Sequence, residues 1–225
     1  MKYYCLVLVC LILSLSSYAD NVKKMLERIH YAQLPFACTK GLHYPEAIWG
    51  YPYATDTHFS IEMYADLGLT VKEAPDPNTD CVMLRKFKVH DERFTLVDVG
   101  MDISESGKKV LVVYRAGELV DYIESEISWW STQEQGVIYV KQWRITSNEE
   151  IIVTWLKVLS ETPINAFSNF KEVNAQRIDM HYRIDANGKF QLTKEVKYTP
   201  RNYTRTYLAD KTKNLWEGNE TPIVE

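Results

Sequence analysis

The chain has 225 residues, of which 46% are hydrophobic and 25% are charged, and its formal net charge is −4 at pH 7. This length and composition suit a globular protein with one substantial core. The acidic balance gives no general attraction for phosphate backbones, so nucleic acid is excluded as an expected partner, and the absence of a Gly-, Ser- or Pro-rich linker favours a single domain.

Residues 1–19 have the parts of a secretory signal peptide. Lys2 provides a positive start, an apolar run extends from Cys5 to Leu15, and Ala19 ends a stretch of small residues that suits cleavage. The apolar run is too short to span a bilayer, and no other run approaches the roughly 20 residues that a spanning helix needs. We therefore expect a secreted or periplasmic protein that begins at Asp20 and has no transmembrane segment.

Lipoprotein anchoring through Cys10 is a less favoured alternative for the same segment. Acyl chains on this cysteine would tether the protein to a membrane. The residue before it, Val9, is bulkier than such processing usually tolerates, and only nine residues would precede the cut. The interpretation as a cleaved signal peptide is therefore preferred.

Cleavage would leave Cys38 and Cys81 as the remaining cysteines of the four in the chain. Two cysteines in an oxidising compartment predict one intramolecular disulfide, which would close a long loop and constrain the unfolded chain. A catalytic thiol is the alternative, but paired cysteines of secreted proteins are far more often structural.

Residues 20–33 are predicted to form a short amphipathic helix. Asp20 suits the N-cap, and Val22, Met25 and Ile29 recur at helical spacing. Residues 34–58 are predicted to be an irregular aromatic segment because three prolines, Pro35, Pro45 and Pro52, interrupt regular pairing.

From residue 59 to residue 208 the hydrophobic period changes to two, and short connections separate most segments. This pattern predicts antiparallel strands joined in hairpins. The fold class is therefore mainly β, an antiparallel hairpin-rich sheet (sandwich, barrel or propeller-like) with one short N-terminal helix. The predicted strands are Phe59–Tyr64, Val82–His90, Phe94–Val99, Lys109–Tyr114, Leu119–Ser125, Val137–Thr146, Ile151–Ser160, Ala175–Asp185, Lys189–Tyr198 and Tyr203–Leu208.

Residues 209–225 have the composition of a poorly ordered C-terminal tail, in which Trp216 could dock back on the body. Trp143 and Trp155 fall within predicted strands and are assigned to packing.

Two hairpins can be registered from sequence. The loop Ala186-Asn187-Gly188 pairs Asp185 with Lys189, which predicts the pairs Ile184/Phe190, Tyr182/Leu192 and Ile178/Val196. The turn Ala116-Gly117 predicts the pairs Tyr114/Leu119, Val113/Val120, Leu111/Tyr122 and Val110/Ile123, with apolar residues on both faces, as in covered central strands. The face with Arg177, Asp179, His181 and Arg183 is interpreted as an ordinary solvated sheet face, although Asp179 could orient His181 as a base if that side were buried.

Flat amphipathic rings gather in the segment from Gly41 to Phe59 and recur later in the chain. Such rings suit stacking on glycans or burial in a protein interface, although most aromatic residues of a β-rich chain fill cores. The predicted ligand-binding residues are Tyr44, Trp49, Tyr51, Tyr53, Trp129 and Trp130.

The same segment carries four groups that could ligate a metal, His43, Glu46, Asp56 and His58. Imidazole and carboxylate suit zinc, but no established ligand spacing is present. Turn capping is the favoured interpretation of these groups, so no metal and no cofactor is predicted.

Glu124 and Glu126 are the candidate catalytic residues. They are two apart on a predicted strand, so alternation would place both carboxylates on one face at roughly 7 Å, a separation compatible with glycoside cleavage. Like charges on an exposed strand face are also common without any catalytic function.

The sequence favours a secreted or periplasmic, non-enzymatic domain that binds a glycan, peptide or protein partner, chiefly between Gly41 and Phe59. The first alternative is a secreted carbohydrate-active hydrolase that uses the two glutamates. The second is a structural envelope protein without a small ligand. The sequence makes no prediction of the oligomeric state.

Overall fold

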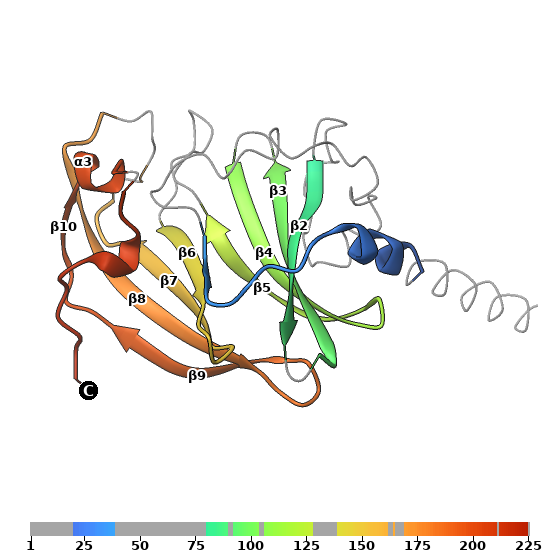
Figure 1. Cartoon of the computed structure of the whole chain (residues 1–225). Helices are drawn as coiled ribbons and strands as arrows, with labels where there is room; N and C mark the ends of the chain where they lie inside the picture. Colours follow the sequence, from blue (N-terminus) through green and yellow to red (C-terminus); the bar gives the residue numbers. More distant parts are fainter. Residues whose placement is uncertain are drawn as a thin grey trace, which may run out of the picture.

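The structure, a computed structural model, describes residues 20–38, 80–89, 92–103, 106–127, 139–161, 164, 169–210 and 212–224. These residues form a mainly β protein with a short N-terminal helix over residues 20–28, as predicted (Figure 1). The strands that the structure describes belong to one antiparallel sheet of ten strands that is not closed. In this part of the chain no helix is long and apolar enough to cross a membrane.

The order of the strands in the sheet largely follows their order in the chain. It runs β10-β8-β7-β6-β5-β4-β3-β2, while β1 adds to β6 and β9 adds to β8. The sheet is therefore built mainly from consecutive hairpins. The strands are β1 (Phe36–Ala37), β2 (Asp80–Val89), β3 (Phe94–Ile103), β4 (Ser106–Arg115), β5 (Glu118–Ile127), β6 (Tyr139–Ile145), β7 (Ile151–Val158), β8 (Glu172–Ile184), β9 (Phe190–Lys197) and β10 (Arg201–Thr204).

The N-terminal helix ends earlier than predicted because the chain after it pairs with β2. The N–H of Lys86 donates to the carbonyl of His30 at 3.2 Å, and the N–H of Ala32 donates to the carbonyl of Lys86 at 2.8 Å. These backbone groups are then used for a sheet contact and not for a further helical turn. The predicted strand Phe59–Tyr64 and most of the segment 34–58 lie outside the described residues.

The last predicted strand, Tyr203–Leu208, is wrong from Arg205 onward. A helical turn, α3 (Arg205–Leu208), follows β10 directly. The side chain of Thr204 caps this turn by accepting a hydrogen bond from the N–H of Tyr207 at 3.2 Å. The residues around Thr204 are typical of a strand, so the change from strand to helical turn at this residue was not predicted.

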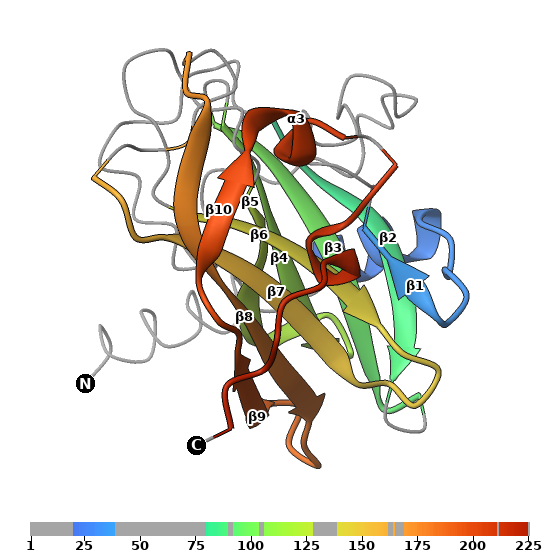
Figure 2. The ribbon, with the colours of Figure 1, turned by 90° about the vertical axis from the view of Figure 1, so that its left-hand side faces the viewer.

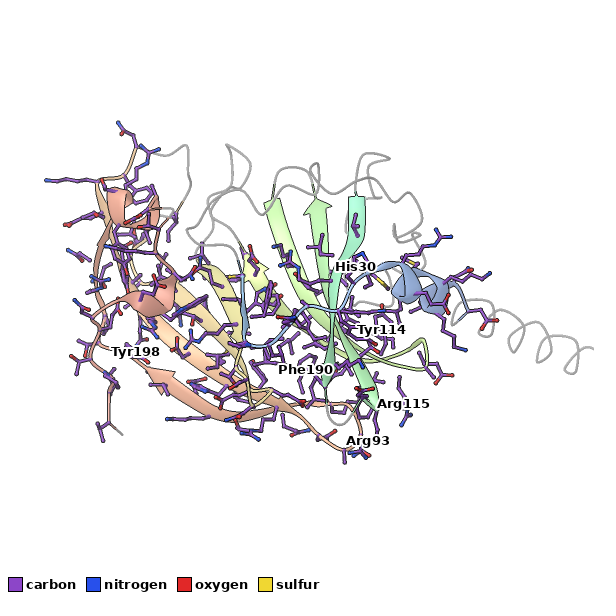
Figure 3. All side chains as sticks on the ribbon, in the orientation of Figure 1. His30, Arg93, Tyr114, Arg115, Phe190 and Tyr198 are labelled. Carbon is purple, nitrogen blue, oxygen red and sulfur yellow. The ribbon has the colours of Figure 1, made fainter. Side chains whose placement is uncertain are left out.

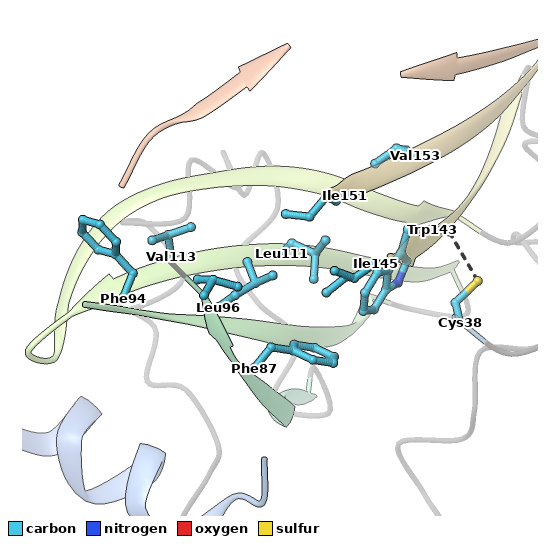
Figure 4. Close-up of a cluster of buried hydrophobic side chains, with 11 residues drawn as sticks. Cys38, Phe87, Phe94, Leu96, Leu111, Val113, Trp143, Ile145, Ile151 and Val153 are labelled. Carbon is cyan, nitrogen blue, oxygen red and sulfur yellow. Dashed lines mark hydrogen bonds between the residues drawn. The ribbon is translucent and has the colours of Figure 1, made fainter. Parts of the chain in front are cut away.

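Strand β4 is covered by apolar side chains on both faces, as predicted, and so is β3, whereas β5, for which the same was predicted, is largely half-buried. On one face, Val97, Val99, Val110 and Val112 pack against the N-terminal helix. On the other face a larger interior cluster joins β2–β5 to the strands β6 and β7 (Figure 4). This interior cluster is made of Cys38, Phe87, Val89, Phe94, Leu96, Leu111, Val113, Trp143, Ile145, Ile151 and Val153.

The sheet curves far enough to bring the β8–β9 hairpin against the β4–β5 hairpin. The N–H of Phe190 donates to Asp121 Oδ2 of β5 at 2.9 Å, and Lys189 Nζ donates to the carbonyl of Val120 (Figure 3). Gly188, at the tip of the β8–β9 hairpin, lies directly against Phe94 and Val120. The two halves of the sheet are thus joined across the interior cluster.

The predicted hairpin registers are confirmed near the turns and wrong beyond them. Next to the turns, Ile184 pairs with Phe190, Tyr182 with Leu192 and Tyr114 with Leu119. Each hairpin then contains a β-bulge, which shifts the register by one residue. As a result Ile178 pairs with Lys197 instead of Val196. The later pairs of the other hairpin become Val113/Asp121, Leu111/Ile123 and Val110/Glu124.

Candidate functional site

All of the predicted ligand-binding residues and possible metal ligands lie outside the described part of the chain. This holds for Tyr44, Trp49, Tyr51, Tyr53, Trp129 and Trp130, and for His43, Glu46, Asp56 and His58. It also holds for the predicted signal peptide and for Cys10. Among the described residues, no group of three or more His, Cys, Asp or Glu side chains could hold a metal ion.

Cys38 is a free, buried thiol, so the predicted disulfide with Cys81 is not formed at this residue. Its Sγ accepts a hydrogen bond from the N–H of Trp143 at 3.4 Å in the interior cluster. The number of cysteines predicted a pair, but it carried no information on the surroundings of Cys38.

The two candidate catalytic glutamates are separated by a β-bulge in β5. Glu124 pairs with Val110 and Glu126 pairs with Lys109, so Ser125 is the extra residue between them. Because Val110 and Lys109 are consecutive on β4, their side chains point to opposite faces of the sheet. The regular alternation that the prediction assumed is therefore interrupted between the two carboxylates.

Glu126 belongs to a buried group of four charges. Its Oε2 lies 3.1 Å from Lys109 Nζ, and the exposed fractions of the two residues are 6% and 1%. In the neighbouring strands, Arg85 Nε lies 3.5 Å from Asp98 Oδ2. Two cations and two anions thus balance one another, as buried charges require.

The charges of this group keep Lys109 protonated and the neighbouring Cys38 thiol unreactive. Burial alone would lower the pKa of Lys109, but the charges of Glu126 and Asp98 outweigh it and raise the pKa, so the ammonium keeps its proton. Burial raises the pKa of the Cys38 thiol far above its usual range, and Glu126 adds to this effect. The group therefore holds charges in place and offers no activated nucleophile.

Glu124 belongs to a different group, which lies at the start of β6 and the end of β7. Its Oε1 lies 2.7 Å from Lys141 Nζ. In the register of the two strands, Tyr139 pairs with Lys157 and Lys141 pairs with Trp155. Aromatic and lysine side chains therefore alternate in a two-by-two array. We call these five residues, Glu124, Tyr139, Lys141, Trp155 and Lys157, the aromatic–lysine cluster.

The rings of the aromatic–lysine cluster are held in a defined geometry. Tyr139 and Trp155 meet edge to face, with centroids 5.8 Å apart and planes at 81°. Lys141 Nζ lies 5.4 Å from the centroid of Tyr139 and 5.7 Å from that of Trp155, and Lys157 Nζ lies 5.8 Å from the latter. Because Glu124 fixes Lys141, the array is preorganised.

The aromatic–lysine cluster is partly open to solvent and carries a net positive charge. Both rings are half-buried and Lys157 is exposed. Two ammonium groups face one carboxylate. Burial raises the pKa of Tyr139, and the charge of Glu124 and its hydrogen bond with the hydroxyl raise it further, so the hydroxyl stays a donor at neutral pH.

Sequence reasoning missed this cluster and assigned Trp155 to packing. The signal was available in the alternation Tyr139, Lys141, Trp143 on one strand and Trp155, Lys157 on the next. The assignment of Trp143 to packing is confirmed, since it is fully buried in the interior cluster. Tyr139 also directly follows the segment that contains Trp129 and Trp130 in the chain.

The face around Arg177 and Asp179 is not a solvated one. The exposed fractions of these residues are 5% and 2%. Arg177 donates two hydrogen bonds to the Asp179 carboxylate, at 3.0 and 2.6 Å, and Thr154 Oγ1 donates another at 2.9 Å. His181 Nδ1 instead lies 3.2 Å from Glu150 Oε1. Asp179 is thus engaged by Arg177 and Thr154, which gives no support to its orienting His181 as a base.

Compared with known protein families, curated proteins and solved structures, the chain gave no match. The functional inference consequently rests on the described side chains. The aromatic–lysine cluster combines partial exposure, fixed rings and unequal charge.

Proposed function

We propose that this chain is a secreted or periplasmic binding protein, without enzymatic activity of its own, that takes a carbohydrate on the aromatic–lysine cluster. The observation that carries the proposal is the fixed edge-to-face pair of Tyr139 and Trp155, flanked by lysines. Ring surfaces suit the C–H faces of sugars, and the surrounding ammonium, hydroxyl and carboxylate groups suit their hydroxyls.

The charge of the aromatic–lysine cluster favours a glycan with acidic groups. Lys141 is engaged by Glu124, whereas Lys157 is exposed on the neighbouring strand. An exposed ammonium beside an aromatic ring offers both a cation for a carboxylate and a surface for stacking. Because the array is already ordered, binding would cost little side-chain entropy.

The alternative function as a glycoside hydrolase loses its main support in the described residues. A two-carboxylate mechanism needs two acids that flank one scissile bond, at the separations typical of inverting or retaining enzymes. Glu126 is instead enclosed with Lys109, and Glu124 is held by Lys141 in a separate cluster. A structural protein without a small ligand remains as the contrasting outcome of the binding experiment.

Export of the chain is part of the same proposal. The N-terminal helix from Asp20 is packed on its own domain through Val22, Met25 and Ile29, so a mature chain that starts there would begin with an anchored element. N-terminal sequencing of the protein recovered from the periplasm or the medium tests this step. A chain that retains Met1 after export would contradict cleavage.

The binding proposal is tested by titrating the protein with a panel of neutral and acidic oligosaccharides. We expect Trp155→Ala and Tyr139→Ala each to weaken binding at least tenfold, which corresponds to about 1.4 kcal/mol. Tyr122→Ala is the matched control, because Tyr122 is an exposed tyrosine of β5 outside the aromatic–lysine cluster. Thermal melting shows that each variant is folded.

Three results would contradict the proposal. Absence of binding to every oligosaccharide would favour the structural alternative. Binding that is equally strong in Trp155→Ala and in the wild type would place the ligand elsewhere. A loss of binding in Tyr122→Ala as large as that in Trp155→Ala would show that the effect is not specific to the aromatic–lysine cluster.

A further inference from the structure

The C-terminal segment 212–224, which we call the strap, runs across the sheet (Figure 2), where Leu215 joins a buried cluster with Val140, Leu156 and Tyr203 and Trp216 packs against the interior cluster. Leu215 is buried there, and its N–H donates to Gln142 Oε1 of β6 at 2.7 Å. The carbonyl of Trp216 accepts a hydrogen bond from Arg177 Nη1 of β8 at 3.2 Å. Side chains of the sheet thus recognise the backbone of the strap.

The carboxylate of Glu220 is the polar anchor of the strap. It accepts hydrogen bonds from Arg201 Nε at 2.8 Å and from the Tyr203 hydroxyl at 2.8 Å, and its Oε1 lies 2.7 Å from Arg201 Nη2. Its other oxygen lies 3.4 Å from Arg177 Nη1, and the side chain is fully buried. Arginine on two sides of one carboxylate is the arrangement that protein sites use to bind acidic ligands.

The guanidinium of Arg201 is itself held between two rings. Its Cζ lies 4.2 Å from the centroid of Tyr203 and 4.8 Å from that of Tyr207. This stacking orients the fork of the guanidinium toward the carboxylate. The site for Glu220 is therefore shaped by β8, β10 and α3 and not by the strap.

The end of the strap adds to the sheet by main-chain pairing. The N–H of Thr199 donates to the carbonyl of Thr221 at 2.9 Å, and the N–H of Ile223 donates to the carbonyl of Lys197 at 2.8 Å. Tyr198 and Pro222 form an antiparallel bridge (Figure 3 shows Tyr198). Apolar and carboxylate anchors followed by strand addition are the features of a bound peptide.

Most of the strap outside these anchors is exposed. Ile223 is exposed, and the exposed fraction of Val224 is 94%. Few apolar contacts at a chain end mark the parts of proteins that open locally before the rest unfolds. The exposed end of the strap can therefore open locally, whereas departure of the whole strap also removes the packing of Leu215 and Trp216.

We propose that the groove formed by Gln142, Arg177, Arg201 and Tyr203 is a peptide-binding site that the strap occupies in its own chain. Its second occupant is the strap of another copy of this chain. The second copy offers the same Leu, Trp and Glu anchors at the same spacing, so it fits every contact described above. The strap of the same chain competes with the strap of the second copy for this groove.

The substitution Glu220→Gln tests this proposal. It should have opposite effects on peptide binding when it is made in the chain and when it is made in the peptide. A fluorescent peptide with the sequence of residues 212–224 is titrated with the full chain. In the chain, Glu220→Gln weakens the competitor, and we expect the peptide to bind at least tenfold more tightly than to the wild type. In the peptide, the same substitution should weaken binding to that variant chain at least tenfold.

Glu217 provides the matched control for the peptide. It is an exposed acid of the strap whose carboxylate accepts a hydrogen bond from the N–H of Asn214 within the strap itself. A Glu217→Gln peptide should bind within about threefold of the unaltered peptide. If it binds as poorly as the Glu220→Gln peptide, general charge attraction explains the result and the assigned site is wrong.

The second copy is tested by native mass spectrometry of wild-type chain mixed with the Glu220→Gln chain. We expect a mixed dimer, because the vacated groove accepts the wild-type strap, and less dimer from the variant alone. Absence of the mixed dimer overturns the assignment of a second copy. Peptide binding to the variant chain that is no tighter than to the wild type overturns the groove itself, and Leu215→Ala serves as the weakened strap if Glu220→Gln does not fold.

Discussion

Lys109 and Glu126 illustrate how a charge is accommodated inside a small β protein. Each is almost fully enclosed, and each has the other at 3.1 Å. The attraction between buried charges offsets their loss of hydration only while both are present. The pair is therefore far more sensitive to the loss of one partner than to the loss of both.

Replacing Lys109 by Met should lower the free energy of unfolding by about 3–5 kcal/mol, because it leaves the Glu126 carboxylate buried without its cation. Urea denaturation measures the change. The double variant Lys109→Met, Glu126→Leu should recover much of the loss. Lys194→Met, on the exposed strand β9, is the control and should change stability by no more than about 0.5 kcal/mol. A single variant as stable as this control would contradict the prediction.

Cys38 should resist alkylation while the protein is folded. Its thiol is buried in the interior cluster, and burial raises its pKa, so little thiolate is present at neutral pH. Treatment with iodoacetamide followed by peptide mass spectrometry should find Cys38 unmodified in buffer and fully modified in denaturant. Recovery of a peptide in which Cys38 is disulfide-linked to Cys81 would show that the free thiol is not the native state.

Residue exposure was the weakest part of the sequence-based prediction. Arg177 and Asp179 alternate with apolar residues on β8, which is the pattern of a solvated face. Their burial comes from Trp216 and Glu220, about forty positions later in the chain, and from the ring of Tyr198. The local periodicity of β8 carries no information on residues that cover the strand from so far along the sequence.

At the scale of elements, the sequence predicted strands and turns well and bulges poorly. Alternation and the turns at Gly117 and Gly188, both with positive φ, identified the hairpins and their first pairs. A bulge adds one residue without changing composition, so the pairing beyond it was misplaced in both hairpins. A bulge also interrupts the alternation that was assumed for Glu124 and Glu126, and each residue enters a different charge cluster.

Gly188 lies where the β8–β9 hairpin meets Phe94 and Val120. Gly188→Ala should therefore destabilise the protein. Its φ of +85° is unfavourable for a residue with a Cβ, and an added Cβ would lie 2.7 Å from Phe94 Cε1. The backbone strain alone should cost about 1–3 kcal/mol. Thermal and urea denaturation measure the effect. Asn187→Ala in the same turn should be nearly neutral, and equal losses in the two variants would contradict this explanation.

At the scale of the whole molecule, the mainly β class, the antiparallel hairpins and the N-terminal helix were all predictable. The curvature that brings the β8–β9 hairpin against β5 was not predictable, because it depends on a contact between segments that are far apart in the chain. The aromatic–lysine cluster has a similar origin, since its residues come from three strands.

The stability of the whole molecule should depend on pH through Glu220. Burial would raise the pKa of this carboxyl, but hydrogen bonds from its own N–H and from Tyr203, together with the charge of Arg201, leave it below its ordinary value. Stabilisation by Glu220 is then complete above the ordinary glutamate pKa of about 4.3 and is lost as the pH falls through the lowered value.

This dependence can be measured by comparing the wild type with Glu220→Gln in urea at several pH values. The wild type should be the more stable protein at pH 7, and the difference should shrink below about pH 4, where its carboxyl becomes protonated. A parallel series with Glu217→Gln should show no such convergence. A difference that stays constant down to pH 3 would mean that the ionised form of Glu220 is not the stabilising one.

The sequential order of the strands from β2 to β8 has a consequence for folding kinetics. Each hairpin can form from segments that are already neighbours, whereas the contacts of Glu220 with Arg177 and Arg201 require the sheet to exist first. The strap should therefore dock after the rate-limiting step. In stopped-flow experiments Glu220→Gln should accelerate unfolding and leave the refolding rate unchanged, and slower refolding would place the strap in the folding nucleus. Residence of the strap in its groove would then govern how long the folded molecule lasts, independently of how fast it is made.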